Sequence, residues 1–382
     1  MAISNYHLNL TVNVSSNQTT KFTDYYILGD RIGTIIYSIV YILGFLGNTF
    51  ALMTFSSRRM RQISSSIFLL TLSISDSVAL VTSLWFFLAD AFSIKLQNYS
   101  ALACRLRTFF AYVFMDLSSW CLAGLAFDRY LRIRLPISSK IICTPRNALI
   151  MILIFFLTLC AINGHYFSPG IGQERSENRT MAHCLENRDT YPKYYYFYKI
   201  IWPKIDMIIF CFLPACIMIL CNVNIVYLRK KQTYHLENPN NNRSQEEATP
   251  INMQQALNGI SPIQKASITH RKAMERQMSL MMAACVIVFL FTTLPVTIHL
   301  ILLEQVITKN QNFARNNVLF TFIFRMLRAF MYIHFASNFY LYCLTSRIFR
   351  AEFIQTITCR KFILTPNHDQ SINVVLNKIS HL

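Results

Sequence analysis

Long apolar stretches recur along the chain, separated by shorter polar segments that carry most of the Lys and Arg residues. A hydrocarbon core about 30 Å thick is crossed by roughly 20 residues of helix, because each residue advances the helix axis by about 1.5 Å. Stretches of this length lie at residues 31–55, 66–92, 102–134, 146–168, 196–227, 276–303 and 318–343. The pattern therefore predicts an all-α bundle of seven transmembrane helices.

The polar segments divide the rest of the chain. Residues 233–265, between spans five and six, are rich in Asn, Gln, Glu, Ser and Pro, so we expect a disordered loop there. We divide the chain into an N-terminal segment at 1–30, a membrane domain at 31–345 and a tail at 346–382 that starts with a short amphipathic helix. The N-terminus lacks the pattern of a cleaved signal peptide, so we expect span one to act as the signal anchor.

Composition agrees with a membrane protein. The chain is 53% hydrophobic and only 14% charged, which is too apolar for an ordinary soluble domain. Its net charge of +18 is concentrated beside the ends of alternate spans. A basic chain could bind nucleic acid, but this clustering favours anionic lipid headgroups instead, and we expect no nucleic-acid partner.

The basic clusters also predict the orientation. Lys and Arg in short loops beside a span remain in the cytoplasm. If the chain crosses seven times, the clusters all fall on one side: Arg58, Arg59 and Arg61; Arg132, Arg134, Lys140 and Arg146; Arg229, Lys230 and Lys231; Arg271, Lys272 and Arg276; Arg347, Arg350, Arg360 and Lys361. We therefore expect a plasma-membrane protein whose N-terminus is extracellular and whose C-terminus is cytoplasmic.

Glycosylation signals agree with this orientation. The Asn-x-Ser/Thr signal is used only where it is exposed to the lumen. Signals that fall outside in this topology are at Asn9, Asn13, Asn17, Asn98 and Asn178. One further match, at Asn242, lies in the loop predicted to be cytoplasmic and should remain unmodified.

The cysteines divide by environment. Most of the eleven lie in apolar spans, where they act as small apolar side chains. Cys104 starts span three and Cys184 follows span four, both on the oxidising side, so we predict a disulfide between them, with two free buried thiols as the alternative. Cys359 follows the amphipathic stretch beside basic residues and is a candidate for palmitoylation, with a free thiol as the alternative.

The order and spacing of several polar residues and prolines resemble the rhodopsin-like, or class A, G-protein-coupled receptors. The most specific element is Asp128-Arg129-Tyr130 at the inner end of span three, followed by Pro136. The similarity covers all seven spans and the helix after span seven; its other members are Gly47, Asn48, Leu72, Asp76, Pro214, Phe289, Pro295, Asn338, Tyr342 and Phe349. The resemblance implies a heterotrimeric G protein and arrestin as partners.

The departures from the family pattern fall on switch elements. Phe339 stands where the family has the Pro of its Asn-Pro-x-x-Tyr motif, which restores a backbone donor and favours a straighter span seven. Thr293 replaces the usual Trp of span six, and Asn222 replaces the usual Tyr of span five. The runs at 338–343 and 293–295 resemble invertebrate neuropeptide receptors.

Asp76 is the clearest ionisable residue within a span, and such residues are functional candidates. The resemblance places Ser118 and Asn338 beside it, which gives oxygen ligands suited to an allosteric sodium ion. The alternative is a hydrated carboxylate that only holds three helices together. We expect no other metal or cofactor.

The outer half of the bundle contains mixed charges and aromatic rings. Ala111 occupies the position where amine receptors carry Asp, which argues against a small amine ligand. Candidates for the ligand pocket are Arg107, Ala111, Asp116, Lys204, Asp206, His299, Arg328 and Tyr332. These residues suit a short neuropeptide. Alternatively, Arg107 and Lys204 snorkel to the interface, the acids pair locally, and His299 bonds a backbone carbonyl.

The resemblance implies a lock between Arg129 of span three and Glu275 at the start of span six. Together with Asp128, Tyr130, Asn338 and Tyr342, these residues form the expected switch for G-protein coupling. The alternative for Glu275 is a solvated side chain among the basic residues of its own helix.

Other function classes lack their required features. A transporter or channel would need a polar pathway, ideally with broken helices in paired halves, and the sequence shows no such symmetry. A retinal protein would need a Lys in span seven, and residues 318–343 contain none. We therefore predict a signalling receptor for an extracellular neuropeptide that is not an enzyme.

Overall fold

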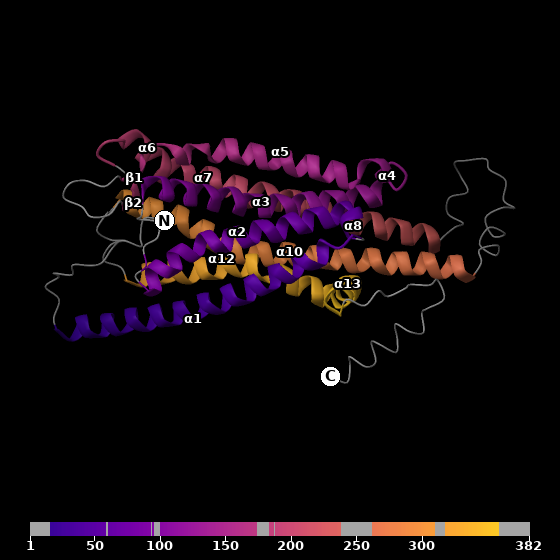
Figure 1. Cartoon of the computed structure of the whole chain (residues 1–382), viewed down its shortest axis with the longest axis horizontal. Coiled ribbons are helices and arrows are strands. Elements are labelled where there is room, and N and C mark those ends of the chain that lie inside the picture. The colour runs from indigo at the N-terminus through magenta and orange to yellow at the C-terminus, as the bar shows by residue number, and fades with distance from the viewer. Residues whose placement is uncertain are drawn as a thin grey trace.

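The computed structural model describes residues 16–58, 60–92, 94, 100–173, 183–186, 188–237, 262–309 and 318–358. Long helices lie side by side along one axis and form an elongated bundle (Figure 1). The long helices are α1 (Ser16–Phe55), α2 (Ser64–Phe92), α3 (Ala101–Arg134), α5 (Pro145–Asn163), α8 (Leu213–Glu237), α10 (Pro262–Lys309) and α12 (Val318–Thr345).

Short elements complete the described chain. They are the 3-10 turns η1 (Met60–Gln62) and η3 (Gly164–Phe167), the helices α4 (Ser139–Ile142) and α13 (Arg347–Thr358), and the strands β1 (Ile171–Gln173) and β2 (His183–Glu186). Within the described residues, six helical segments are long and apolar enough to cross a membrane. Helix α12 packs against α1 and α10 as the seventh member of the bundle, so the predicted seven-helix fold is confirmed.

The fifth span is irregular in a way that the sequence analysis did not predict. It begins with α6 (Pro192–Tyr196), continues through the π-helical turn η4 (Phe197–Ile201), α7 (Trp202–Asp206) and a second π-helical turn, η5 (Met207–Phe212), and ends with α8. Pro203 and Pro214 each follow a π-helical turn closely. Because proline has no amide hydrogen, each one removes a regular helix bond and favours a wider turn before it.

Some boundaries differ from those predicted. Helix α1 begins at Ser16, well before residue 31. The segment predicted to be a disordered loop, 233–265, is helical at both ends, because α8 continues to Glu237 and α10 begins at Pro262. The polar residues there include good helix formers such as Lys, Gln and Glu. Residues 238–261 lie outside the described chain.

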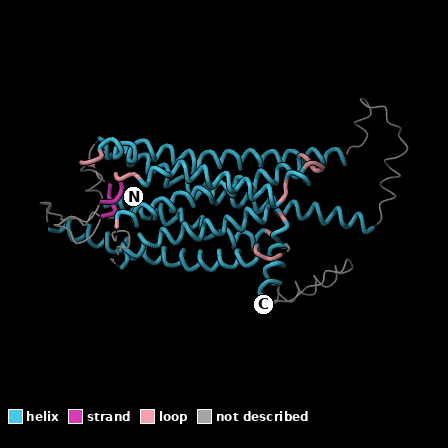
Figure 2. Tube along the Cα trace, turned by 45° about the horizontal axis from the view of Figure 1, so that its top comes forward, coloured by secondary structure: helices cyan, strands magenta, loops and turns pink. Residues whose placement is uncertain are grey.

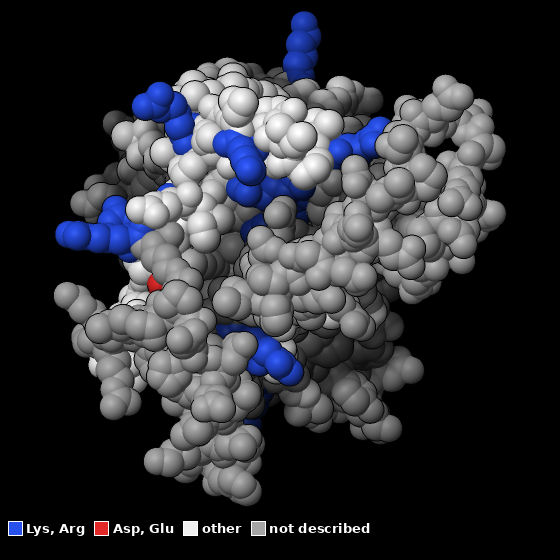
Figure 3. Space-filling view, turned by 90° about the vertical axis from the view of Figure 1, so that its right-hand side faces the viewer, with Lys and Arg blue, Asp and Glu red and all other residues white. Residues whose placement is uncertain are grey.

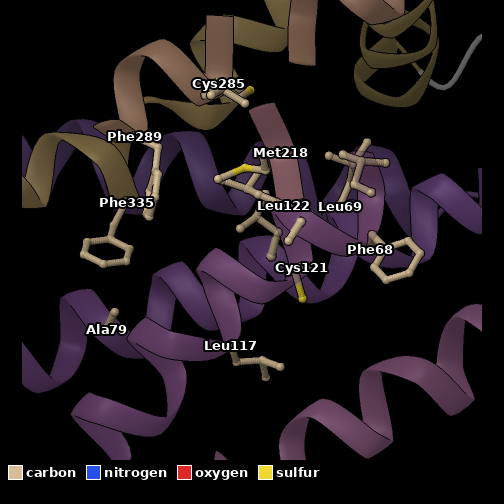
Figure 4. Packing of buried hydrophobic residues seen from close by; sticks show 14 of the residues in the cluster. Phe68, Leu69, Ala79, Leu117, Cys121, Leu122, Met218, Cys285, Phe289 and Phe335 are labelled. Carbon is tan, nitrogen blue, oxygen red and sulfur yellow. The ribbon is translucent and has the colours of Figure 1, made fainter. Parts of the chain in front are cut away.

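Apolar side chains fill the interior of the bundle and also cover its outward faces. The interior contains fully buried residues such as Leu72, Leu122, Phe289 and Phe335, several of which meet in Figure 4. Large apolar side chains also cover the outward faces of the bundle, among them Ile35, Leu149, Leu153 and Phe291. A soluble protein would bury such a surface, so the outward faces suit contact with lipid tails.

Helices α2 and α3 approach each other very closely at Gly124. A β-carbon built on Gly124 would lie 2.6 Å from a ring carbon of Phe68 in α2. Only glycine fits there without displacing that ring.

The two ends of the bundle differ. At one end, called here the disulfide end, Cys104 and Cys184 are joined and β1 pairs antiparallel with β2. Arg105 Nε donates to the carbonyl of Ile171 at 2.8 Å and ties this hairpin to α3. At the opposite end, called here the α13 end, α13 turns away from the bundle axis after α12 (Figure 2). The predicted disulfide is confirmed.

Candidate functional site

Asp76 lies at the centre of the bundle, and its carboxylate links three helices. Ser118 Oγ of α3 donates to Asp76 Oδ1 at 2.6 Å, and Asn338 Nδ2 of α12 donates to Oδ2 at 2.7 Å. The structure thus brings together the three residues of the predicted sodium site. Two groups of α12 beside this site are buried without a hydrogen-bond partner in the described chain: Asn338 Oδ1 and Tyr342 Oη. These carboxylate, hydroxyl and amide oxygens have the ligand chemistry that hard cations prefer.

His334 also belongs to this central region and was missed by the sequence analysis. It is fully buried in α12 and packs edge-on against Phe289 with 5.0 Å between ring centroids. Neither of its ring nitrogens has a hydrogen-bond partner in the described chain. A lone His in an apolar stretch gives little signal in the sequence, because its surroundings depend on distant helices.

At the α13 end, Asp128 is held by residues that the sequence analysis did not name. Its carboxylate accepts hydrogen bonds from Ser64 Oγ at 2.5 Å, Ser65 Oγ at 2.7 Å and Arg132 Nε at 3.1 Å. Arg132 also donates to Ser64 Oγ and to the carbonyl of Cys143. This network ties the start of α2 to the end of α3, beside Arg129 and Tyr130.

Charge at this end is predominantly positive. Burial, assisted by the negative charge of Asp128, raises the pKa of the Cys143 thiol to about 11, so the thiol is neutral. Lys and Arg side chains gather on this face of the molecule (Figure 3).

Glu275 belongs to α10, but its side chain lies outside the described residues, so the predicted lock with Arg129 remains a prediction. Gln277 Oε1 accepts from the backbone amide of Arg347 at 3.3 Å, which joins α10 to α13.

At the disulfide end, two arginines converge on one tyrosine. Arg107 of α3 is only 4% exposed, and its guanidinium donates to the Thr82 carbonyl at 3.4 Å and to Thr108 Oγ1 at 3.3 Å. Arg328 of α12 lies near Tyr332, as Arg107 does. This burial excludes the alternative that Arg107 snorkels to the interface.

The predicted acids lie deeper in the bundle than Arg107, on α3 and at the end of α7. Asp116 is buried and accepts a hydrogen bond from Asn163 Nδ2 of α5 at 2.9 Å. Asp206, the last residue of α7, interacts electrostatically with Asp116. Lys204 is exposed, which agrees with the alternative that it faces the interface. His299 and Ala111 are buried.

An aromatic cluster surrounds these acids and was also missed. His165 lies against Trp202 with 4.0 Å between ring centroids, and Tyr112 stacks on Tyr166 at 4.7 Å. Tyr166 is fully buried. The run of aromatic residues at 194–198 was the available signal, but the sequence does not reveal which helices these rings face.

Several predicted modification sites lie outside the described residues. They are Asn9, Asn13, Asn98, Asn178 and Cys359. Asn17 lies in the first turn of α1, and its side chain is not described.

Comparison with known proteins places these features in context. The protein-family model described as "7 transmembrane receptor (rhodopsin family)" matches residues 47–345. Galanin receptor type 2 from Homo sapiens is 30% identical over 150 residues, which cover 39% of this chain and 38% of that receptor. The galanin-like G-protein coupled receptor npr-9 from Caenorhabditis elegans is 27% identical over 156 residues, which cover 38% of this chain and 36% of that protein.

One relative aligns over a longer region. A probable G-protein coupled receptor from Caenorhabditis elegans is 25% identical over 347 residues, which cover 86% of this chain and 71% of that protein. The match to the galanin receptors is shorter, and the chain spans about two fifths of their length.

Proposed function

Because the chain belongs to the rhodopsin family of seven-transmembrane receptors, we propose that it binds a short extracellular neuropeptide and activates a heterotrimeric G protein. Relatives named as galanin receptors support a peptide as the ligand. The departures at Phe339, Thr293 and Asn222 argue for altered switch mechanics rather than for a different class of protein. A transporter is not favoured.

The orientation is part of the proposal. The disulfide end is extracellular, because a disulfide persists in an oxidising compartment. In a chain that crosses seven times, the glycosylation signals at 1–30, Asn98 and Asn178 fall on the extracellular side. The α13 end, with its gathered Lys and Arg, faces the cytoplasm and anionic lipid. The proposed location is the plasma membrane.

The pair of arginines at the disulfide end carries the ligand proposal. Arg107 is 4% exposed, and both Arg107 and Arg328 lie near Tyr332. A carboxylate or carbonyl of a ligand bound near Tyr332 would be attracted by these two guanidinium groups. The adjoining aromatic rings suit the side chains of a peptide.

Signal transfer is conformational. A ligand shifts the bundle toward its active state only by binding that state more tightly than the resting one. Asp76 joins α2, α3 and α12, so its network lies between the proposed ligand pocket and Arg129 at the cytoplasmic end. The G protein, and later arrestin, would bind at that end.

A sodium ion at Asp76 would add regulation. Asp76, Ser118 and the amide oxygen of Asn338 would hold it. The bound ion would supply a positive charge that neutralises the buried carboxylate. The ion would therefore favour whichever state of the bundle keeps these oxygens together.

The direct test uses full-length receptor in membranes with a purified G-protein trimer. A library of synthetic neuropeptide-length sequences, in amidated and free-acid forms, is applied while guanine nucleotide exchange is measured. We expect at least one peptide to accelerate exchange in the parent receptor and not in Arg129→Ala at equal surface expression. Peptide-induced ion flux without nucleotide exchange would favour the transporter alternative.

A further inference from the structure

Asp116 and Asp206 place two carboxylates on neighbouring spans. Asp116 lies in α3 and is 2% exposed, and Asp206 ends α7 and is half-buried. Trp202, one turn before Asp206, contacts Tyr112, one turn before Asp116, which places the two acids on facing turns of the two spans. Among the described residues, no Lys, Arg or His forms an ion pair with either acid. Two like charges at this depth of a membrane protein are costly unless a positive group accompanies them.

Several polar atoms around the two acids lack a hydrogen-bond partner among the described residues. Asn163 is fully buried and uses its amide nitrogen for Asp116 Oδ2 and for the carbonyl of Leu159. That leaves Asp116 Oδ1 and Asn163 Oδ1 buried without a hydrogen-bond partner in the described chain. Trp202 Nε1 in the same region is likewise buried without a partner in the described chain. Buried polar atoms are costly to leave unsatisfied, so a polar ligand group would be stabilised here. The orphaned oxygen of Asn163 is evidence independent of the two acids.

Aromatic faces lie beside the same acids. Tyr112 and Tyr166 stack on each other, and both interact electrostatically with Asp206. Trp202 lies one turn before Asp206 in α7 and meets Tyr112 edge-on at 6.5 Å. Carboxylates combined with aromatic faces attract a guanidinium or ammonium group through both charge and cation–π contacts.

The backbone also supports a binding role. Helix α7 is bracketed by π-helical turns, and the second one begins at Met207, directly after Asp206. π-helical turns are rare and often occur at functional sites, because they change the direction of side chains along a helix. Trp202, which directly follows the first of these turns, contacts Tyr112 of α3.

We propose that Asp116 and Asp206 form a subsite for a basic group of the ligand, a guanidinium or an amine. The subsite rests on the proposed receptor function and lies apart from Arg107 and Arg328, which would take an acidic or carbonyl group. The ligand class is therefore a peptide with a basic group placed deep between α3 and the fifth span and an acceptor group near α12.

The test measures binding without signalling. Full-length receptor purified in detergent micelles is heated with increasing n-butylguanidinium chloride at constant ionic strength, and Tm is recorded. n-Butylurea, which has a similar shape without the charge, is the matched probe. We expect butylguanidinium to raise Tm saturably in the parent and butylurea to leave it unchanged, because only a ligand that binds the folded state raises Tm.

Variants of the two acids show where the guanidinium probe binds. Asp206→Asn should abolish the rise in Tm, and Asp206→Glu, which keeps the charge, should retain it. Asp189→Asn removes an exposed acid after β2 and is the control for net charge, so it should behave as the parent. If Asp206→Asn does not fold, Asp116→Asn is measured instead, with the same expected loss.

Two results would overturn the subsite. An equal rise in Tm in Asp206→Asn or Asp116→Asn would place the binding elsewhere. A complete lack of response in the parent would mean that the two carboxylates satisfy each other by sharing a proton. This readout is independent of the receptor proposal: a peptide-driven nucleotide exchange with no guanidinium response refutes only the subsite, and a guanidinium response without exchange refutes only the receptor function.

Discussion

The ring of Phe339 in α12 meets the ring of Phe353 in α13 nearly edge-on, with 5.1 Å between ring centroids and 72° between ring planes. Phe339 also packs against Phe50 of α1 at 5.6 Å and against Phe349 of α13 at 5.7 Å. The residue that replaces the family's proline is therefore the central ring of an aromatic cluster that joins α1, α12 and α13.

Replacing Phe339 with Ala should destabilise the receptor. Truncating a buried Phe typically costs about 3–5 kcal/mol through lost packing and the cavity left behind. Thermal unfolding in micelles should show a lower Tm, with the matched control Phe291→Ala, a ring that is 68% exposed on α10, changing it little. Equal effects of the two variants would show that the cluster adds no stability.

The disulfide between Cys104 and Cys184 should stabilise the disulfide end of the bundle. Replacing Cys104 or Cys184 with Ser should lower surface expression, because the link contributes roughly 2–4 kcal/mol in the chain-entropy model. The double replacement should cost little more than either single one. Losses that add fully, measured by surface labelling, would contradict a shared bond.

The arginine pair should determine agonist potency. Arg107→Ala or Arg328→Ala should weaken a peptide found in the exchange screen by at least tenfold, about 1.4 kcal/mol, without loss of surface expression. Arg188→Ala, which removes an exposed basic residue after β2, is the control and should leave potency unchanged. If Arg107→Ala and Arg328→Ala both give the same dose–response curve as the parent, the basic pocket is excluded.

Sodium should change agonist potency through Asp76. If the ion binds there, exchanging sodium chloride for choline chloride should shift the dose–response curve of the parent. Asp76→Asn should remove that shift, because the amide lacks the charge that attracts the ion. A sodium shift of the same size in Asp76→Asn would place the ion elsewhere or leave Asp76 as a structural link alone.

Glu275 should restrain the resting state. If it pairs with Arg129, Glu275→Gln should favour the active state by about 1–2 kcal/mol and raise basal nucleotide exchange several-fold without ligand. Arg129→Ala should instead reduce signalling, since this Arg is also expected to contact the G protein. A basal rate that does not change in Glu275→Gln at matched surface expression would exclude the lock.

Features set by local chemistry were predictable from the sequence. The spans follow from apolar length alone, so α2, predicted at 66–92, is found at Ser64–Phe92. The pairing of Cys104 with Cys184 follows from their shared compartment. The grouping of Asp76, Ser118 and Asn338 came from the family resemblance and matches the hydrogen bonds.

Features that depend on side chains from distant helices were not predictable. Asp128 was predicted only as part of the switch with Arg129, but Ser64 and Ser65 of α2 also donate hydrogen bonds to it, and serines in an apolar stretch give no such signal. The contact of Asp116 with Asn163 depends on how α3 and α5 are rotated. The π-helical turns of the fifth span reflect a backbone register that a hydrophobic pattern does not record.

The close approach of Gly124 to Phe68 fixes α2 against α3. Ser64 and Ser65 fasten the same two helices at one end through Asp128, and Ser118 fastens them at the centre through Asp76. Helices α2 and α3 therefore form the part of the bundle that keeps a fixed geometry during activation. Spectroscopic labels placed on α2 and α3 should keep one separation whatever ligand is bound, and changes of distance should be seen only when one label is moved to another span.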